Sequence, residues 1–371
     1  MGSVLRTTFV TALLLVFLCA AAMGQSGRVQ PTPTPEPDDT PVTIDTEEVK
    51  INVIAFDMEG QFVRDVAGED LVIAENNILH QPTSVRRIPA HVLIMMDTGG
   101  ELRSVKSLSH TRETARALVA NLRLENPVAV LQYGDTAEIV AEWTTDRNEA
   151  IAAINRTNFG RRSVFVQALE LARSFLMNDQ VENRHLVLIS DGTDSTNDRT
   201  ERRAALQRIL GTDINVHVLS YTRMEATDIE PRTKSITNAP VPKAMPDEVV
   251  AQLPQGVRDQ RQAPKIGPTI SVDRKHLERM RNRKADLEAS ELDLIYIAES
   301  SNGTIIVPES TDEMIEKTAT VARMIDSSYL ITYTPKIPLR EQSGTRNIEV
   351  TSRREGLIIH ANRKLIVAPS R

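Results

Sequence analysis

The chain has 371 residues, of which 40% are hydrophobic and 25% are charged, and its formal net charge is −6. This length can bury one large core or two modest ones. The acidic balance excludes a broad phosphate-binding surface, so we expect no nucleic-acid partner. The single cysteine, Cys19, lies in an N-terminal apolar run. We therefore expect a mature chain without disulfides or a thiolate metal site.

The first residues have the composition of a signal peptide. Arg6 supplies positive charge, residues 9–22 are apolar, and residues 22–24 offer small side chains at the cleavage positions. We predict a signal peptide over residues 1–24 and a periplasmic or secreted protein with no membrane span after cleavage. An uncleaved anchor is the alternative. Residues 25–41 alternate proline with small polar residues, which favours an extended spacer.

Short segments of alternating apolar and polar residues occur at both ends of the chain, in residues 42–89 and 327–371. Alternation with a period of two residues predicts antiparallel strands. Neither set is large enough to form a stable sheet alone. We therefore predict that the two sets pair into one small β-sandwich, with the middle of the chain inserted between them. Two separate β units are the alternative.

Residues 90–326 alternate apolar strands with amphipathic helices. Residues 92–96 are continuously apolar, as expected for a strand that is covered on both faces. The predicted fold class is α/β, with a doubly wound, mostly parallel sheet and helices on both of its faces.

Residues 223–270 interrupt this alternation and are rich in proline, glutamine and charge. This composition predicts a disordered insertion. A strongly charged helix is expected after it, from residue 273 to about residue 300. The helix is interpreted as an ordinary surface helix or as a docking arm for a partner.

Acidic residues follow two of the apolar strands. Asp97 ends the first, and Asp191 follows the strand at residues 186–189, with Glu101 and Asp194 nearby. Because parallel strands end at the same edge of a sheet, Asp97 and Asp191 should lie side by side. Clustered carboxylates require a cation or a proton. The alternative is that these acids cap the following helices.

An apolar strand that ends in aspartate, an amphipathic helix, a β-hairpin and a later strand that ends in Ser190-Asp191-Gly192 resemble a von Willebrand factor type A (VWA) domain. The resemblance covers residues 90–326 without the insertion. The flanking β segments and residues 328–335 are similar to an exported bacterial family with a β segment before this domain. The resemblance implies a non-enzymatic module that binds another protein through its top face. It also implies a metal ion-dependent adhesion site, in which Mg²⁺ keeps an open position for a partner's carboxylate.

Only part of that metal site can be transferred to this chain. Asp97 and Asp191 match the two aspartates of the motif, and Ser163 stands at the position of its threonine. Gly99 and Glu101 replace its two serines, and Mg²⁺ demands near-octahedral oxygen geometry. The resemblance therefore implies a degenerate adhesion site.

Arg161 and Arg162 stand where the family often has glycines. A guanidinium at this position could reach Asp97 or Asp191 and replace the metal's charge. Three states stay open: a bound metal, a site neutralised by arginine, or neither.

Other chemistries have little support in the sequence. Nucleophile-elbow, phosphate-loop and zinc-protease motifs are absent from the sequence. His91, His185 and His217 fall at or within predicted strands, where a structural role is expected. The alternative function is phosphoryl transfer, or metal-dependent hydrolysis, by the strand-end aspartates.

Overall fold

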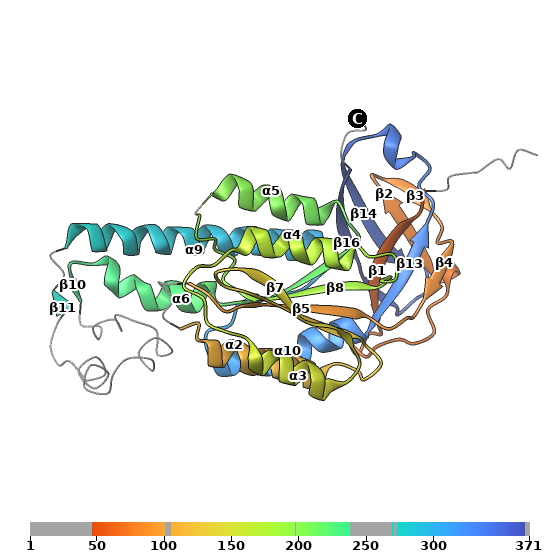
Figure 1. The fold of residues 1–371 in the computed structure, drawn as a ribbon. Coiled ribbons are helices and arrows are strands. Elements are labelled where there is room, and N and C mark those ends of the chain that lie inside the picture. Colours follow the sequence, from red (N-terminus) through yellow and green to blue (C-terminus); the bar gives the residue numbers. More distant parts are fainter. Residues whose placement is uncertain (1–46, 101–104, 197, 238–268, 271–272, 368–371) are drawn as a thin grey trace, which may run out of the picture. The chain divides into compact units, whose positions relative to one another are not determined.

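The computed structural model describes the chain in five stretches, which Figure 1 draws as coloured ribbon: residues 47–100, 105–196, 198–237, 269–270 and 273–367. The signal peptide predicted over residues 1–24 and the spacer over residues 25–41 lie outside them. Within the described residues, no helix is both long enough and apolar enough to cross a membrane.

A six-stranded sheet forms the centre of the described structure, in the order β12-β9-β8-β5-β6-β7. All neighbouring strands run parallel except β7, which pairs antiparallel with β6. The strands are β5 (His91–Asp97), β6 (Val128–Tyr133), β7 (Ala137–Thr144), β8 (Arg184–Ser190), β9 (Asn215–Ser220) and β12 (Ile305–Ile306). Every residue of β6, β8 and β9 is buried, as expected for strands covered on both faces. The predicted mostly parallel α/β sheet is confirmed.

Helices cover both faces of this sheet (Figure 1). One face packs against α4 (Phe165–Leu176), α5 (Arg199–Leu210) and α9 (Arg274–Ser300). The other face packs against α2 (Leu108–Asn121), α3 (Arg147–Arg156) and α10 (Thr311–Asp326). Ser or Asp side chains accept backbone hydrogen bonds at the first turns of five of them, which are α2, α3, α5, α9 and α10.

The two ends of the described chain form a β-sandwich of two four-stranded sheets, ordered β15-β1-β13-β4 and β16-β14-β2-β3. Its strands are β1 (Val49–Phe56), β2 (Leu71–Glu75), β3 (Ile78–His80), β4 (Ser84–Arg86), β13 (Ser328–Tyr333), β14 (Gly344–Ser352), β15 (Ile358–His360) and β16 (Asn362–Val367). N-terminal β1 pairs antiparallel with C-terminal β13, and β2 pairs with β14. The strand pairing predicted between the two ends is therefore present, and one apolar core joins them.

Buried polar side chains connect the sandwich to the parallel sheet. Asn52 of β1 donates a hydrogen bond to Asn183, with 2.8 Å between its Nδ2 and the acceptor Oδ1. The ring of His185 stacks on that of His217, with 5.3 Å between centroids, and a hydrogen bond of 3.0 Å joins their nitrogens. These two histidines have the structural environment that their positions in strands predicted.

The prediction of a disordered insertion over residues 223–270 was wrong for the first part of that range. Helix α6 (Thr222–Ile229) continues directly from β9, and Ile229 is buried against Met280 and Leu287 of α9. A one-turn helix (Glu230–Thr233) follows, and the short strands β10 (Ile236–Thr237) and β11 (Thr269–Ile270) pair with each other. Apolar residues at helical spacing in α6 provide the buried contact that the overall composition conceals. Residues 238–268 lie outside the described stretches.

Candidate functional site

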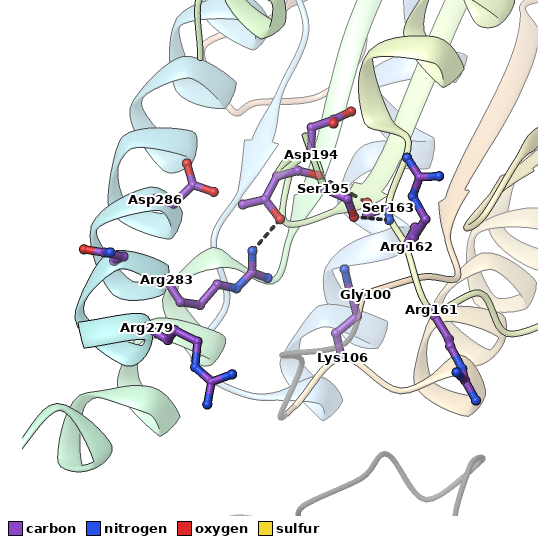
Figure 2. Close-up of a pocket in the computed structure, with 12 residues that line it drawn as sticks. Gly100, Lys106, Arg161, Arg162, Ser163, Asp194, Ser195, Arg279, Arg283 and Asp286 are labelled. Carbon is purple, nitrogen blue, oxygen red and sulfur yellow. Dashed lines mark hydrogen bonds between the residues drawn. The ribbon is translucent and has the colours of Figure 1, made fainter. Parts of the chain in front are cut away.

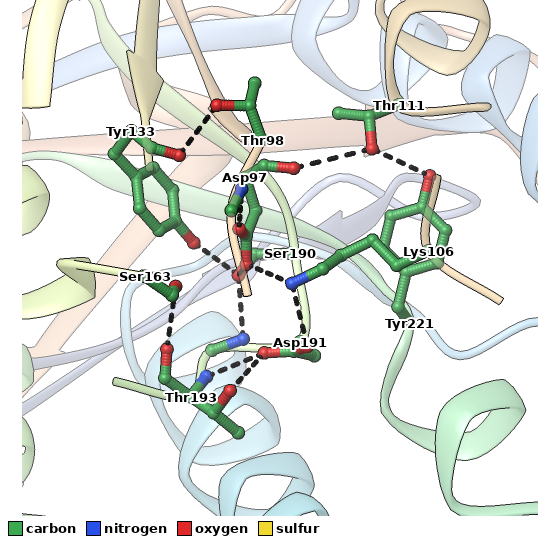
Figure 3. A network of polar contacts seen from close by, with 12 residues as sticks. Asp97, Thr98, Lys106, Thr111, Tyr133, Ser163, Ser190, Asp191, Thr193 and Tyr221 are labelled. Atoms are coloured by element: carbon green, nitrogen blue, oxygen red, sulfur yellow. Dashed lines mark hydrogen bonds and ion pairs between the residues drawn. The ribbon is translucent and has the colours of Figure 1, made fainter. Parts of the chain in front are cut away.

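A lysine lies between the two strand-end aspartates. The ammonium nitrogen of Lys106 is 2.7 Å from Oδ2 of Asp97 and 2.9 Å from Oδ2 of Asp191 (Figure 3). Both aspartates are fully buried, and Lys106 is only 2% exposed. Parallel strands β5 and β8 end at the same edge of the sheet, which brings the two carboxylates together as predicted.

A second cation reaches the same group from α9. The guanidinium of Arg283 donates to Oδ2 of Asp191 at 2.9 Å and to the hydroxyl of Thr193 at 2.6 Å. The other oxygen of Asp191 accepts hydrogen bonds from the backbone N–H and the hydroxyl of Thr193. Two carboxylates and two cations therefore form one compact ion cluster.

The pKa values of the cluster follow from this balance. Burial opposes ionisation of Asp191, but Lys106 and Arg283 outweigh it and hold the pKa of that carboxyl far below its usual range. Burial also opposes the charged form of Lys106, yet the two aspartates outweigh it and raise its pKa. Burial raises the pKa of Asp97, with Lys106 acting against that rise. Lys106 thus remains an ammonium ion beside an ionised Asp191.

The rest of the Asp97 carboxylate is also occupied. Its Oδ1 accepts the N–H of Gly99 at 3.1 Å, and its Oδ2 accepts the hydroxyl of Ser190 at 3.1 Å. The hydroxyl of Tyr133 lies 2.5 Å from that of Ser190 (Figure 3). Burial raises the pKa of Tyr133 well above its usual value, so this hydroxyl stays neutral. Asp97 is therefore enclosed by protein donors.

The predicted residues Ser163 and Asp194 have structural partners. The Ser163 hydroxyl donates to the backbone carbonyl of Thr193 at 3.2 Å. Asp194 accepts the backbone N–H of Val166 at the start of α4 and the N–H and hydroxyl of Thr196. Asp194 thus binds the first turn of α4, which precedes it in the chain, and Asp198 instead caps the following helix α5. Glu101 lies outside the described residues.

The arginines proposed from the sequence do not neutralise the aspartates. Arg161 and Arg162 are both exposed, and the backbone N–H of Arg162 donates a hydrogen bond to Oδ1 of Asp135 at 2.9 Å. No ion pair among the described residues joins either arginine to Asp97 or Asp191. A cation supplied by the protein does lie between the two aspartates, but it is Lys106 and neither Arg161 nor Arg162.

The sequence contains an indication of Lys106 as the buried cation, but none of Arg283. Lys106 follows β5 directly before Ser107, the residue that caps α2. A lysine in a loop between a strand-end aspartate and a helix start was therefore a candidate in the sequence. Arg283 had no comparable signal, because only the packing of α9 on the sheet brings it to Asp191.

The described residues do not fit the Mg²⁺ site that the resemblance implies. A Cβ atom at Gly99, where the motif has a serine, would lie 1.8 Å from the backbone oxygen of Arg162 and 2.8 Å from the Cα of Gly134. No serine ligand can stand there without moving the backbone. The position between the carboxylates is filled by the Lys106 ammonium. In the described part of the chain, no three His, Cys, Asp or Glu side chains are grouped to hold a metal.

A pocket of about 540 Å³ adjoins the ion cluster, since Lys106 and Arg283 also line the pocket (Figure 2). Five cationic side chains line it, which are Lys106, Arg161, Arg162, Arg279 and Arg283. Hydroxyl groups of Ser163, Thr193 and Ser195 and the carboxylates of Asp194 and Asp286 also line it. The pocket can accept an anionic group and offers several donors to it.

Known proteins resemble this chain as follows. Residues 92–193 match the family model of the von Willebrand factor type A domain, which confirms the predicted resemblance over a stretch that contains Asp97 and Asp191. BatB from Bacteroides thetaiotaomicron is 16% identical, with 63% of this chain and 98% of that chain covered and a TM-score of 0.38. An aerotolerance-related membrane protein from Bacteroides fragilis is 18% identical with the same coverage and TM-score. A von Willebrand factor type A protein from Catenulispora acidiphila is 10% identical over 88% of this chain and 74% of that chain, with a TM-score of 0.40. No curated protein matches the chain significantly.

Proposed function

Because residues 92–193 carry a von Willebrand factor type A domain, we propose that this chain is an exported, non-enzymatic module that binds another protein. The proposed interface is the arginine-lined pocket at the carboxyl edge of the parallel sheet, above a degenerate metal site. The proposed ligand is an acidic segment of the partner. Export rests on the signal-peptide composition of residues 1–24.

The observation that carries the proposal is that three arginines at the pocket are exposed and have no ion-pair partner among the described residues. Arg161, Arg162 and Arg279 are exposed, and no ion pair or side-chain hydrogen bond joins their guanidinium groups to a described residue. Elsewhere, many partly exposed arginines are paired with carboxylates, for example Arg86 with Glu182, Arg208 with Glu170 and Arg223 with Glu291. Three unpaired guanidinium groups around one pocket, in a chain of net charge −6, favour an anionic ligand.

Carboxylates fit the pocket better than a phosphate backbone does. A guanidinium can hold an aspartate or glutamate side chain through two parallel hydrogen bonds. Asp194 and Asp286 also line the pocket, so its lining is not uniformly positive. Such a mixed lining is well suited to separated carboxylates, each of which can meet one guanidinium away from the two aspartates. A protein segment with several acidic side chains therefore matches the charge pattern.

The burial of the strand-end aspartates argues for binding over phosphoryl transfer or hydrolysis. A catalytic carboxylate must reach the substrate or the attacking water. Asp97 and Asp191 are both fully buried, and each accepts hydrogen bonds from neighbouring protein groups on both of its oxygens. The arrangement supports a structural role beneath the pocket.

The proposal is tested with fluorescent polyglutamate and polyglutamine peptides and the purified chain, by fluorescence anisotropy at low and high salt. We expect salt-sensitive binding of polyglutamate that is lost in Arg161→Glu/Arg162→Glu/Arg279→Glu. The control Arg64→Glu/Arg353→Glu changes exposed arginines of the β-sandwich segments and should retain binding.

Two results would contradict the proposal. One is equal binding of both peptides, and the other is polyglutamate binding that survives in the triple variant. Competition by inorganic phosphate at concentrations that leave a chloride control unchanged would instead indicate a phosphate-bearing ligand.

A further inference from the structure

We propose that Lys106 is a tethered cation that replaces the divalent metal of the adhesion site, so that the carboxyl edge of the sheet holds its shape without any bound metal. This inference goes beyond the proposed function, which concerns what the pocket binds. It concerns what stabilises the floor of that pocket.

The position of the ammonium group is the first argument. Lys106 Nζ lies within 3 Å of one oxygen from each strand-end aspartate, and all three side chains are buried. The motif assigns a metal ion to this place between Asp97 and Asp191. An ion cannot enter without displacing the ammonium from both carboxylates.

Charge is the second argument. Asp97 and Asp191 bring two negative charges, and Lys106 and Arg283 bring two positive charges, so the cluster sums to 2 − 2 = 0. A divalent ion added to the intact cluster would place further positive charge beside the buried Lys106 ammonium and the Arg283 guanidinium, which is strongly unfavourable. The cluster is therefore complete without a metal.

The remaining oxygen donors are the third argument. The Ser163 hydroxyl is directed to a backbone carbonyl, and the Thr193 hydroxyl lies between Asp191 and Arg283. Position 99 cannot carry a serine, because its Cβ would overlap the backbone of Arg162. At the described positions 99, 163 and 193, a hydroxyl ligand for a near-octahedral Mg²⁺ is thus engaged elsewhere or sterically excluded.

The tether is the fourth argument. The carboxylate of Glu225, itself fully buried, accepts the backbone N–H groups of Val105 and Lys106. The next residue, Ser107, caps α2 through the N–H of His110. Contacts with two helices, α6 and α2, therefore fix the backbone of Lys106. A cation bound in this way cannot be removed by chelation.

The first experiment uses the full wild-type chain without any partner. Calorimetric titration with Mg²⁺, Mn²⁺ and Ca²⁺ should show no binding, and the melting temperature should be the same in EDTA and in millimolar divalent ion. Saturable binding, or a rise of the melting temperature with any of the three ions, would overturn the proposal. Neither result depends on whether the pocket binds acidic peptides, so failure of the proposed function would be distinguishable.

The second experiment removes the ammonium. Lys106→Met should lower the melting temperature in EDTA, because the buried Asp97 then loses its ion-pair partner and Asp191 keeps only Arg283. The charge-balanced variant Lys106→Met/Asp97→Asn should recover part of that loss without metal, whether or not the single variant folds. Lys275→Met, at an exposed position of α9, is the matched control and should melt like the wild type.

The outcomes of the second experiment are also decisive. A Lys106→Met variant that is as stable as wild type in EDTA would refute the assigned role of the ammonium. Equal instability of the single and the charge-balanced variants would refute the charge argument. Recovery of Lys106→Met by divalent ions, with no such effect on wild type, would be the strongest support.

Discussion

Glu225 holds Lys106 in place through the backbone. Its carboxylate accepts the N–H of Lys106 at 2.5 Å and that of the preceding Val105 at 2.7 Å. Glu225 belongs to α6, which follows the strand next to β8. The helix that the sequence interpretation assigned to a disordered insertion therefore positions the central cation of the site.

Glu225→Ala should lower the free energy of unfolding by about 1–3 kcal/mol, because it leaves buried N–H groups without their acceptor. Urea unfolding followed by circular dichroism measures the loss. The control is Glu288→Ala on α9, where the side chain is 59% exposed and a change within about 0.5 kcal/mol is expected. Equal effects of the two substitutions would show that Glu225 has no special role.

Arg279 and Arg283 lie one turn apart on α9 and should have different roles. Arg283→Ala removes charged hydrogen bonds to Asp191 and Thr193, so we expect a stability loss of about 2 kcal/mol. Arg279→Ala removes an exposed, unpaired side chain and should change stability by less than about 0.5 kcal/mol while weakening polyglutamate binding. Denaturant unfolding and anisotropy on both variants check this separation. The account would be contradicted if Arg279→Ala were the more destabilising of the two.

Restoring the first serine of the motif should harm the protein. Gly99→Ser places a Cβ 1.8 Å from a backbone oxygen, so it should destabilise the fold by about 1–3 kcal/mol or more and create no affinity for Mg²⁺. Gly68→Ser is the steric control, since a Cβ there would meet only ordinary contacts at 3.8 Å. Thermal unfolding and Mg²⁺ calorimetry provide the measurement. A stable Gly99→Ser variant with new Mg²⁺ affinity would disprove the steric argument.

Stability should decrease as the pH falls below about 6.5, the ordinary pKa of histidine. Burial lowers the pKa of His217 to about 4, and burial together with His217 and His91 lowers that of His185 well below its usual value. In this pH range the unfolded chain takes up protons that the folded chain does not. Each histidine should therefore remove about 1.4 kcal/mol per pH unit. The contribution of His217 is fully present above pH 6.5 and is lost as the pH falls towards about 4.

Between pH 6.5 and about 4, His217→Gln should reduce the slope of unfolding free energy against pH by about 1.4 kcal/mol per pH unit, the contribution of one histidine. The substitution His360→Gln, at an exposed position of β15, is the control and should leave the slope unchanged. Urea unfolding at several pH values gives both slopes. An unchanged slope in His217→Gln would mean that His217 is already protonated in the folded protein, or that other groups dominate.

The fold and the meeting of the two aspartates could be predicted because both depend on local patterns. Continuous apolar runs identify strands covered on both faces, and the acids that end two such runs must share one edge of a parallel sheet. The pairing of β1 with β13 followed from the same kind of argument, since neither end of the chain could form a sheet alone.

The cations could not be assigned in the same way. A lysine in a loop is usually exposed, and only the convergence of Asp97 and Asp191 makes a buried position favourable for Lys106. The position of Arg283 depends on how α9 packs over the sheet, and no periodic pattern in the sequence indicates that packing. Arg161 and Arg162 follow Gly160, whose backbone packs against Gly134 so closely that a Cβ would not fit. Their loop is placed by that contact, and the side chains remain exposed at the pocket.

The central claim is that the Lys106 ammonium occupies the position of the metal. The most direct measurement is a crystal structure of the wild-type chain soaked in Mn²⁺, with anomalous differences recorded for manganese. The account predicts continuous lysine density between Asp97 and Asp191 and no anomalous peak there. An anomalous peak between the two carboxylates, with Lys106 displaced from them, would contradict it.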